Sequence, residues 1–234
     1  MNITLYEAFF IQIIRYIIRK IKLRGIMKRI MYFAFFLLVS TILYSQSSCP
    51  TTVTYEGKTY NTVLIGTQCW LKENLNVGTR ISGIQNPSNN VTIEKYCYNN
   101  LESNCDTYGG LYQWNEAMAY STTPGTQGIC PSGWHIPTYA EFQTLGAPLI
   151  TNGNALKAIG QGTGGGAGTN TSGFSLLIAG YRPSDGNFYN LGNYTYYWSS
   201  TEYSTNNPYS MYLDFNTTSI TFDYGKKEDR KSVV

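Results

Sequence analysis

The stretch that decides the fold is residues 128–142, GICPSGWHIPTYAEF, which holds a cysteine, two prolines, a tryptophan and the only histidine of the chain. Thr138 stands where it can cap a helix, and Glu141 follows three residues later, which is the spacing of a capping box. Phe142 and Leu145 would then face the core. This stretch predicts a loop that leads into a helix over residues 138–149.

His135 is the candidate for chemistry within this stretch. A catalytic histidine needs a nucleophile or a carboxylate beside it, and the sequence indicates no such partner. We favour the alternative of a structural histidine whose ring bonds to the backbone. A zinc site is disfavoured, because the chain has no second histidine and no C-x-x-C pair. We therefore predict no catalytic residue and no metal ligands, and expect a non-enzymatic protein.

Outward from this stretch, the pattern is that of an α+β protein. A second helix is predicted over residues 111–118, where Leu111, Trp114 and Met118 share one helical face. A β-hairpin is predicted over residues 53–65. Further strands are predicted at residues 174–181, 196–200, 211–215 and 219–224. Loops are predicted at residues 78–95 and 160–168, the second a mobile glycine-rich segment. Two main helices among short, mostly antiparallel strands follow from this pattern.

The N-terminal 45 residues differ in composition from the rest. Lys28 and Arg29 precede an almost wholly apolar run over residues 30–44, and Ser45 follows. A basic start, a short apolar run and a small-residue exit are the parts of a secretory signal peptide. We predict an upstream segment over 1–26, a signal peptide over 27–45 and a single domain over 46–234.

The upstream segment has three open interpretations. In the first, it is upstream sequence included by a wrong choice of start codon, and Met27 is the ordinary start. In the second, it is a basic amphipathic helix on a membrane surface. In the third, it stays uncleaved as a membrane anchor. Lipidation at Cys49 is a further route to a membrane, although Gln46 stands where a bacterial lipobox normally has leucine. We expect membrane association only through these features, and an extracellular or outer cell-surface location.

Charge argues against nucleic-acid binding. The chain carries a net charge of +3, but 7 of its 17 basic residues and 1 of its 14 acidic residues precede residue 46. The remaining 10 basic and 13 acidic residues give the domain a net charge of −3. Nucleic-acid binding needs a basic patch on the folded domain. The 21 tyrosines instead suggest a surface that binds through aromatic contact area.

All five cysteines lie beyond the signal, where exported proteins form disulfides. Cys97 and Cys105 flank a turn-forming stretch, and we predict that they pair. The pairing of Cys49, Cys69 and Cys130 stays open, and the odd count leaves one thiol free or paired outside this chain.

Five segments carry a family resemblance: residues 66–79 (GTQCWLKENLNVGT), 97–118 (CYNNLESNCDTYGGLYQWNEAM), 128–145 (GICPSGWHIPTYAEFQTL), 173–182 (GFSLLIAGYR) and 196–201 (YYWSST). In this order they resemble the Fibrobacter succinogenes major paralogous domain of exported bacterial proteins. Residues 134–142 are also similar to the Leu-Pro-Thr-x-x-Glu-Trp element of formylglycine-generating proteins. This likeness implies a C-type-lectin-like fold with small twisted sheets and long loops, but it transfers no activity.

One departure from the family concerns the C-terminal strand. Family members usually close with a Ser-Val-Arg-Cys-type strand, whereas this chain reads Lys-Ser-Val-Val over residues 231–234. The resemblance implies a cysteine after this strand, which would supply a partner for the one cysteine that five cysteines leave unpaired.

The candidate binding residues are Tyr196, Tyr197 and Trp198 with the carboxylate of Glu202. An aromatic platform beside a carboxylate is typical of sugar binding, and packing in a strand and core is the alternative. The oxygens that could bind calcium belong to Asp185, Asn187, Asp214 and Asp223. The carbohydrate-binding triplets of calcium-dependent lectins do not occur in the chain.

The function expected from these features is an exported, non-enzymatic binding or adhesion module for polysaccharide or protein. One alternative is a structural protein of the cell envelope. A second is an enzyme of unknown reaction on a formylglycine-generating-enzyme-like fold.

Overall fold

The computed structural model describes residues 11–16, residue 32 and residues 49–234. Residues 11–16 are helical and belong to a unit of their own, and Cys49–Val234 form a compact unit. The predicted signal peptide and most of the upstream segment lie outside the described residues. Within the described ranges, no helix is long and apolar enough to cross a membrane.

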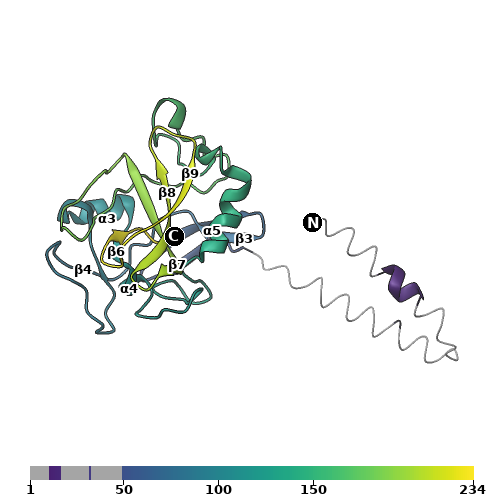
Figure 1. The fold of residues 1–234 in the computed structure, drawn as a ribbon, viewed down its shortest axis with the longest axis horizontal. Coiled ribbons are helices and arrows are strands. Elements are labelled where there is room, and N and C mark those ends of the chain that lie inside the picture. The colour runs from purple at the N-terminus through teal and green to yellow at the C-terminus, as the bar shows by residue number, and fades with distance from the viewer. Residues whose placement is uncertain (1–10, 17–31, 33–48) are drawn as a thin grey trace. The chain divides into compact units, whose positions relative to one another are not determined.

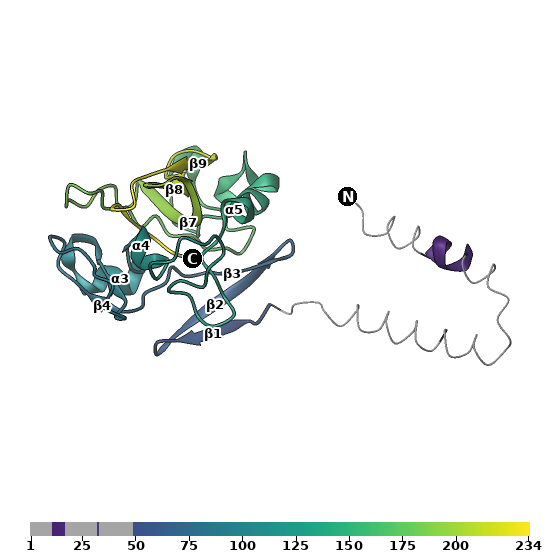
Figure 2. The same cartoon turned by 60° about the horizontal axis from the view of Figure 1, so that its bottom comes forward.

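The chain enters the compact unit through an antiparallel three-stranded sheet, β1 (Thr52–Tyr55), β2 (Lys58–Ile65) and β3 (Gln68–Leu71) (Figure 2). The predicted hairpin is therefore confirmed. Its two-residue turn is Glu56-Gly57, and both residues have positive φ, at 48° and 74°. That is the backbone twist that short hairpin turns require.

The second three-stranded sheet consists of β7 (Tyr194–Ser204), β8 (Asn207–Asp214) and β9 (Ile220–Tyr224), also antiparallel (Figure 1). β10 (Arg230–Lys231) pairs with β6 (Tyr112–Gln113), and Ser232 continues beside Tyr197 of β7 in parallel. The C-terminal strand thus links β6 to the sheet. The strands predicted at residues 196–200, 211–215 and 219–224 are confirmed within a few residues.

The predicted helix after residue 138 is α5 (Tyr139–Gly146), continued by η2 (Ala147–Leu149). Its capping box is present. The Thr138 Oγ1 accepts a hydrogen bond from the Glu141 N–H at 3.2 Å, and the Glu141 carboxylate accepts one from the Thr138 N–H at 2.8 Å. Phe142 and Leu145 are buried, as the spacing predicts.

The other predicted helix is wrong in extent. α4 (Trp114–Ala117) is a single turn, because Gln113 still belongs to β6, and Ala119 and Tyr120 take positive φ values of 47° and 59°. A helix that the sequence did not indicate, α3 (Glu102–Tyr108), lies between Cys97 and Gly109. Short 3-10 turns and one small parallel strand pair complete the elements: η1 (Tyr98–Asn100), η3 (Gly153–Ala155), η4 (Gly164–Gly166), β4 (Thr79–Arg80) and β5 (Glu94–Lys95).

Two further predictions need correction. Residues 174–181 make isolated bridges rather than a regular strand, since Ser175 and Gly180 have φ values of 64° and 68°. The glycine-rich loop over residues 160–168, predicted to be mobile, is held by hydrogen bonds to buried side chains. The buried Lys157 Nζ donates to the Gly166 carbonyl at 2.9 Å, and the Asn154 side chain donates to the Gly165 carbonyl at 2.8 Å.

Two disulfides close the described domain. The predicted pair Cys97–Cys105 is confirmed, and Cys49 pairs with Cys69. Since the Cys49 sulfur is in a disulfide, it is not free to carry a lipid thioether in this structure. Cys130 is a buried free thiol, and burial raises its pKa to about 12. It packs in the core that residues of both sheets and α5 share.

Candidate ligand-binding surface

The four predicted binding residues do not lie together on one surface. Tyr197 and Trp198 are each 0% exposed. The Tyr197 hydroxyl donates to the Asn74 Oδ1 at 2.8 Å, and the Trp198 Nε1 donates to the Tyr112 carbonyl at 2.9 Å. Both side chains belong to the core, so the platform prediction is wrong for them and the packing alternative holds.

Glu202 is engaged elsewhere. Its carboxylate forms an ion pair with Lys227, whose ammonium lies 4.4 Å from the centre of the Trp114 ring. The pairing of β7 with β8 shifts register between Trp198 and Glu202, so Glu202 does not continue the alternation that starts at Tyr194. It therefore adds no free carboxylate beside Tyr196.

Tyr196 is part-buried and stands at the centre of a larger aromatic group. We name this group the outer tyrosine face; its members are Tyr181, Tyr189, Tyr194, Tyr196 and Tyr212. The Tyr196 ring lies 4.8 Å from that of Tyr181, 5.1 Å from that of Tyr212 and 6.5 Å from that of Tyr194, between ring centres. Tyr189 continues the group 6.2 Å beyond Tyr181. Five tyrosine rings thus form one continuous group.

Strand geometry explains how these rings meet. Tyr194 and Tyr196 are two residues apart on β7, so they point to the same face of the sheet. Tyr212 on β8 stands directly opposite Tyr196 in the register. Tyr181 and Tyr189 form a bridge across the turn at residues 183–187, which places them next to β7.

Carboxylates orient two of the phenols. The Tyr189 hydroxyl donates to the Asp185 Oδ2 at 2.8 Å, and this hydrogen bond raises the pKa of Tyr189. Asp214 pairs with Tyr194 across the two strands, and its charge raises the pKa of Tyr194. The outer tyrosine face therefore combines aromatic rings with acceptors at its edges.

Lys231 lies against the same group. Its Nζ stands 5.1 Å from the centre of the Tyr196 ring and 4.2 Å from that of Trp198, and donates to the Ser210 Oγ at 3.3 Å. Burial lowers the pKa of Lys231 to about 8, against the opposing influence of Asp229 and Asp223. The buried ammonium holds the Tyr196 and Trp198 rings in place, because a cation–π contact is stronger when it is desolvated.

The predicted calcium oxygens do not converge. Asp185 accepts the Asn187 N–H, Asp214 accepts the Asn216 N–H, and Asp223 accepts the Tyr224 N–H, each at 2.8–2.9 Å within its own turn or strand end. Among the residues described, the one cluster of three metal-type ligands is Cys97, Glu102 and Cys105. Its sulfurs are joined in a disulfide, so they are not thiolate ligands.

His135 has a carboxylate partner that the sequence did not reveal. Its Nε2 lies 2.9 Å and 3.0 Å from the two Glu141 oxygens. That carboxylate already serves the capping box, and its hydrogen bonds to Thr138 and His135 outweigh burial and lower the pKa of Glu141. The pair therefore fixes the loop to the start of α5.

A second aromatic group lies on the same sheet. We name it the tyrosine ladder; its members are Tyr139, Tyr203, Tyr209 and Tyr224, with Phe222. Tyr139 stacks on Tyr209 at 4.0 Å, and Tyr203 stacks on Tyr224 at 4.3 Å. Tyr209 and Tyr212 are three residues apart on β8, so the ladder and the outer tyrosine face lie on opposite faces of the sheet.

A family comparison agrees with the segments quoted from the sequence. The model of the Fibrobacter succinogenes major domain matches residues 63–232, which run from β2 to the C-terminal strand. The chain belongs to this family. Comparisons with curated proteins and with solved structures yield no match.

Sequence reasoning found one member of the outer tyrosine face and missed four. The alternation of Tyr194 with Tyr196 was a usable signal, because both fall on one face of any strand that contains them. Tyr212 required the register of β8, and Tyr181 and Tyr189 required the bridge between them. Nothing local to those residues marks them as neighbours of Tyr196.

Proposed function

We propose that this member of the Fibrobacter succinogenes major domain family is an exported, non-enzymatic binding module that holds polysaccharide on its outer tyrosine face. The observation that carries the proposal is the continuous group of five tyrosines with Asp185 and Asp214 at its edges. A sugar ring has an apolar C–H face and a rim of hydroxyls. Aromatic rings suit the first and carboxylate oxygens suit the second.

Rigidity supports this use of the surface. Tyrosine offers a large contact area with only two side-chain torsions to immobilise, so binding costs little conformational entropy. Tyr196 is further held between neighbouring rings and the Lys231 ammonium. A surface that is ordered before binding loses less free energy on association.

The proposed location is outside the cell, at its outer surface or secreted. Its support is the predicted signal peptide together with the two disulfides, Cys49–Cys69 and Cys97–Cys105, which persist in oxidising compartments. A C-type-lectin-like architecture is part of the proposal. It is supported by a helix packed on a small antiparallel sheet and by long connecting segments.

The test is retention of the purified domain on insoluble polysaccharides and on a glycan array, with the double variant Tyr194→Ala/Tyr212→Ala beside wild type. We expect retention of wild type and at least a fivefold loss of affinity in the double variant, since two aromatic contacts contribute roughly 1–3 kcal/mol together. The matched control is Tyr203→Ala/Tyr224→Ala, which removes two tyrosines from the ladder and should leave affinity unchanged.

Two results would contradict the proposal. One is the absence of any glycan ligand, in which case a pull-down from cell envelopes distinguishes a protein ligand from the structural envelope protein, which would fractionate tightly with cells and bind no soluble ligand. The other is an equal loss of affinity in both double variants, which would show that binding does not depend on the outer tyrosine face.

A further inference from the structure

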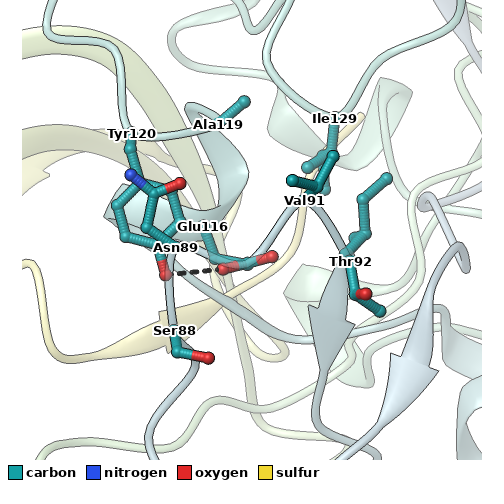
Figure 3. A pocket seen from close by; sticks show the side chains of 9 residues that line it. Ser88, Asn89, Val91, Thr92, Glu116, Ala119, Tyr120 and Ile129 are labelled. Atoms are coloured by element: carbon teal, nitrogen blue, oxygen red, sulfur yellow. Dashed lines mark hydrogen bonds between the residues drawn. The ribbon is translucent and has the colours of Figure 1, made fainter.

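A separate cavity of about 270 Å³ lies at the wall formed by α4 and the loop before β5 (Figure 3). Polar and apolar side chains share its lining: Ser88, Asn89, Thr92, Glu116 and Tyr120, with Val91, Ile93, Ala119 and Ile129. Its volume is just under the roughly 300 Å³ at which pockets for drug-sized molecules begin. It is therefore sized for a small molecule or for one end of a larger one.

Glu116 is the charged group of this cavity, and it has no cationic partner within the described residues. Its side chain lines the cavity although the residue is only 3% exposed. One carboxylate oxygen accepts the Glu94 N–H at 2.9 Å, and the other accepts the Tyr120 hydroxyl at 2.9 Å. Burial raises the pKa of Glu116, and the two hydrogen bonds that its carboxylate accepts oppose that rise only in part. When ionised, Glu116 is therefore a buried negative charge without a counter-charge among the described residues.

The backbone around the cavity is held in a costly conformation. Ala119 and Tyr120 are consecutive residues with positive φ, and they place the phenol of Tyr120 on the Glu116 carboxylate. Val91 has a φ of 71°, although it is β-branched, and it is fully exposed at the edge of the cavity. Residues in such conformations cost free energy and persist only where the surrounding structure fixes them. They are more frequent at ligand-binding and active sites than elsewhere.

From these observations we infer that the cavity binds a small primary ammonium group, with Glu116 as its counter-ion and the apolar wall in contact with the carbon chain that bears it. An ammonium donates three hydrogen bonds and brings the missing positive charge. Each Glu116 oxygen keeps a free lone pair for such a donor beside the bond it already accepts. A divalent metal fits less well, since calcium needs six to eight oxygens and a single carboxylate lines the cavity.

This site is independent of the outer tyrosine face, so its test needs no polysaccharide. The probe is n-butylammonium, with 1-butanol as the neutral molecule of similar shape, titrated into ¹⁵N-labelled protein and followed by amide shifts. We expect saturable shifts at Ala119, Tyr120 and Ile129 with a Kd on the order of 1–10 mM for so small a probe. D-Glucosamine and Nα-acetyl-lysinamide then distinguish an amino sugar from a lysine side chain as the source of the ammonium.

Two variants sharpen the result. Glu116→Gln keeps the shape and removes the charge. Its amide oxygen can still accept the Glu94 N–H, while its NH2 group can only donate to the Tyr120 hydroxyl oxygen, so that hydrogen bond reverses. This variant should weaken the binding of n-butylammonium at least tenfold. Asn89→Lys is at an exposed position beside Glu116 and Tyr120 (Figure 3), so it leaves the core unchanged. The new lysine would supply a competing positive charge to Glu116 and should weaken the binding of n-butylammonium by a similar factor. Glu228→Gln, an exposed acid outside the cavity lining, is the matched control and should bind as wild type.

The inference is overturned if 1-butanol binds as tightly as n-butylammonium. It is equally overturned if no saturable shift appears at about tenfold above the expected Kd, or if folded Glu116→Gln binds unchanged. If Glu116→Gln does not fold, unchanged binding by Asn89→Lys overturns it instead.

Discussion

The outer tyrosine face and the tyrosine ladder are built from the same residue type on opposite faces of one sheet, yet they serve different ends. In the ladder, Tyr139 at the start of α5 stacks on Tyr209, and Phe222 meets the Tyr139 ring edge-on at 5.7 Å. Its rings are used to pack the helix on the sheet. In the outer tyrosine face, carboxylates and a buried lysine contact the rings instead.

This difference teaches that tyrosine content does not identify a binding surface. What matters is what stands behind and beside the rings. The ladder has two exposed members, Tyr203 and Tyr224, at 55% and 50%, but their rings stack on each other and their hydroxyls have no carboxylate partner among the hydrogen bonds of the described residues. The outer tyrosine face is less exposed, and it combines its rings with the carboxylates of Asp185 and Asp214.

The largest expected effect comes from removing the support of the outer tyrosine face. Trp198→Ala deletes a fully buried ring that contacts Lys231, and should lower the free energy of unfolding by about 3–5 kcal/mol. Urea denaturation measures this. Tyr203→Ala in the ladder is the control, with an expected loss below about 1 kcal/mol. Equal losses of unfolding free energy in the two variants would contradict the structural difference between the outer tyrosine face and the tyrosine ladder.

The second effect is a pH dependence that belongs to Lys231. Its folded pKa of about 8 is below the value of 10.5 expected in the unfolded chain. Between these values the unfolded state binds more protons, so stability should rise with pH. From pH 8 to about 9.5 this lysine should contribute a gain of about 1–2 kcal/mol, measured as the difference between wild type and Lys231→Met.

Lys231→Met removes the titrating group and should therefore remove this contribution to stability. Tyrosines of the unfolded chain begin to ionise in this pH range, and burial raises the pKa of several of them in the folded protein, so their contribution to stability falls as pH rises. The comparison with the variant cancels that contribution. Urea midpoints at three pH values suffice. A rise of the same size in the variant would show that another group causes it.

The third effect concerns the base of the ladder. Thr138→Ala removes the cap of α5, next to the Tyr139 ring, and should cost about 1 kcal/mol of unfolding free energy. Tyr212→Ala on the outer tyrosine face, whose ring meets those of Tyr194 and Tyr196 on the neighbouring strand, should cost less. Urea denaturation of both variants compares them, and the reverse order would mean that the outer tyrosine face is the more structural group.

The smallest effect is electrostatic and local. Asp214→Asn removes the charge that opposes ionisation of Tyr194, so the pKa of Tyr194 should fall. Asp185→Asn should instead lower the pKa of Tyr189, because that carboxylate accepts the Tyr189 hydroxyl. NMR titration of ring carbons separates the two phenols. If either substitution leaves its own tyrosine unmoved, the carboxylate does not belong to the outer tyrosine face.

Local patterns predicted much of the fold and little of the surface. The capping box at Thr138 and Glu141, the hairpin at residues 53–65 and the Cys97–Cys105 pair all depend on residues close in sequence, and all three are present. The helix over residues 111–118 was overpredicted, because its apolar spacing says nothing of the positive φ values that follow α4.

The sequence by itself determined the family, the α+β class and the alternation that sends Tyr196 to one face of β7 and Tyr197 to the other. These follow from interactions within a few residues, whose geometry the backbone sets. Only the tertiary structure decided which distant groups meet: Tyr181 beside Tyr196, Lys231 beneath them, and the Glu94 backbone on the Glu116 carboxylate. Such contacts depend on strand register and chain crossing, which no local spacing encodes, and the proposed binding chemistry of this protein resides in them.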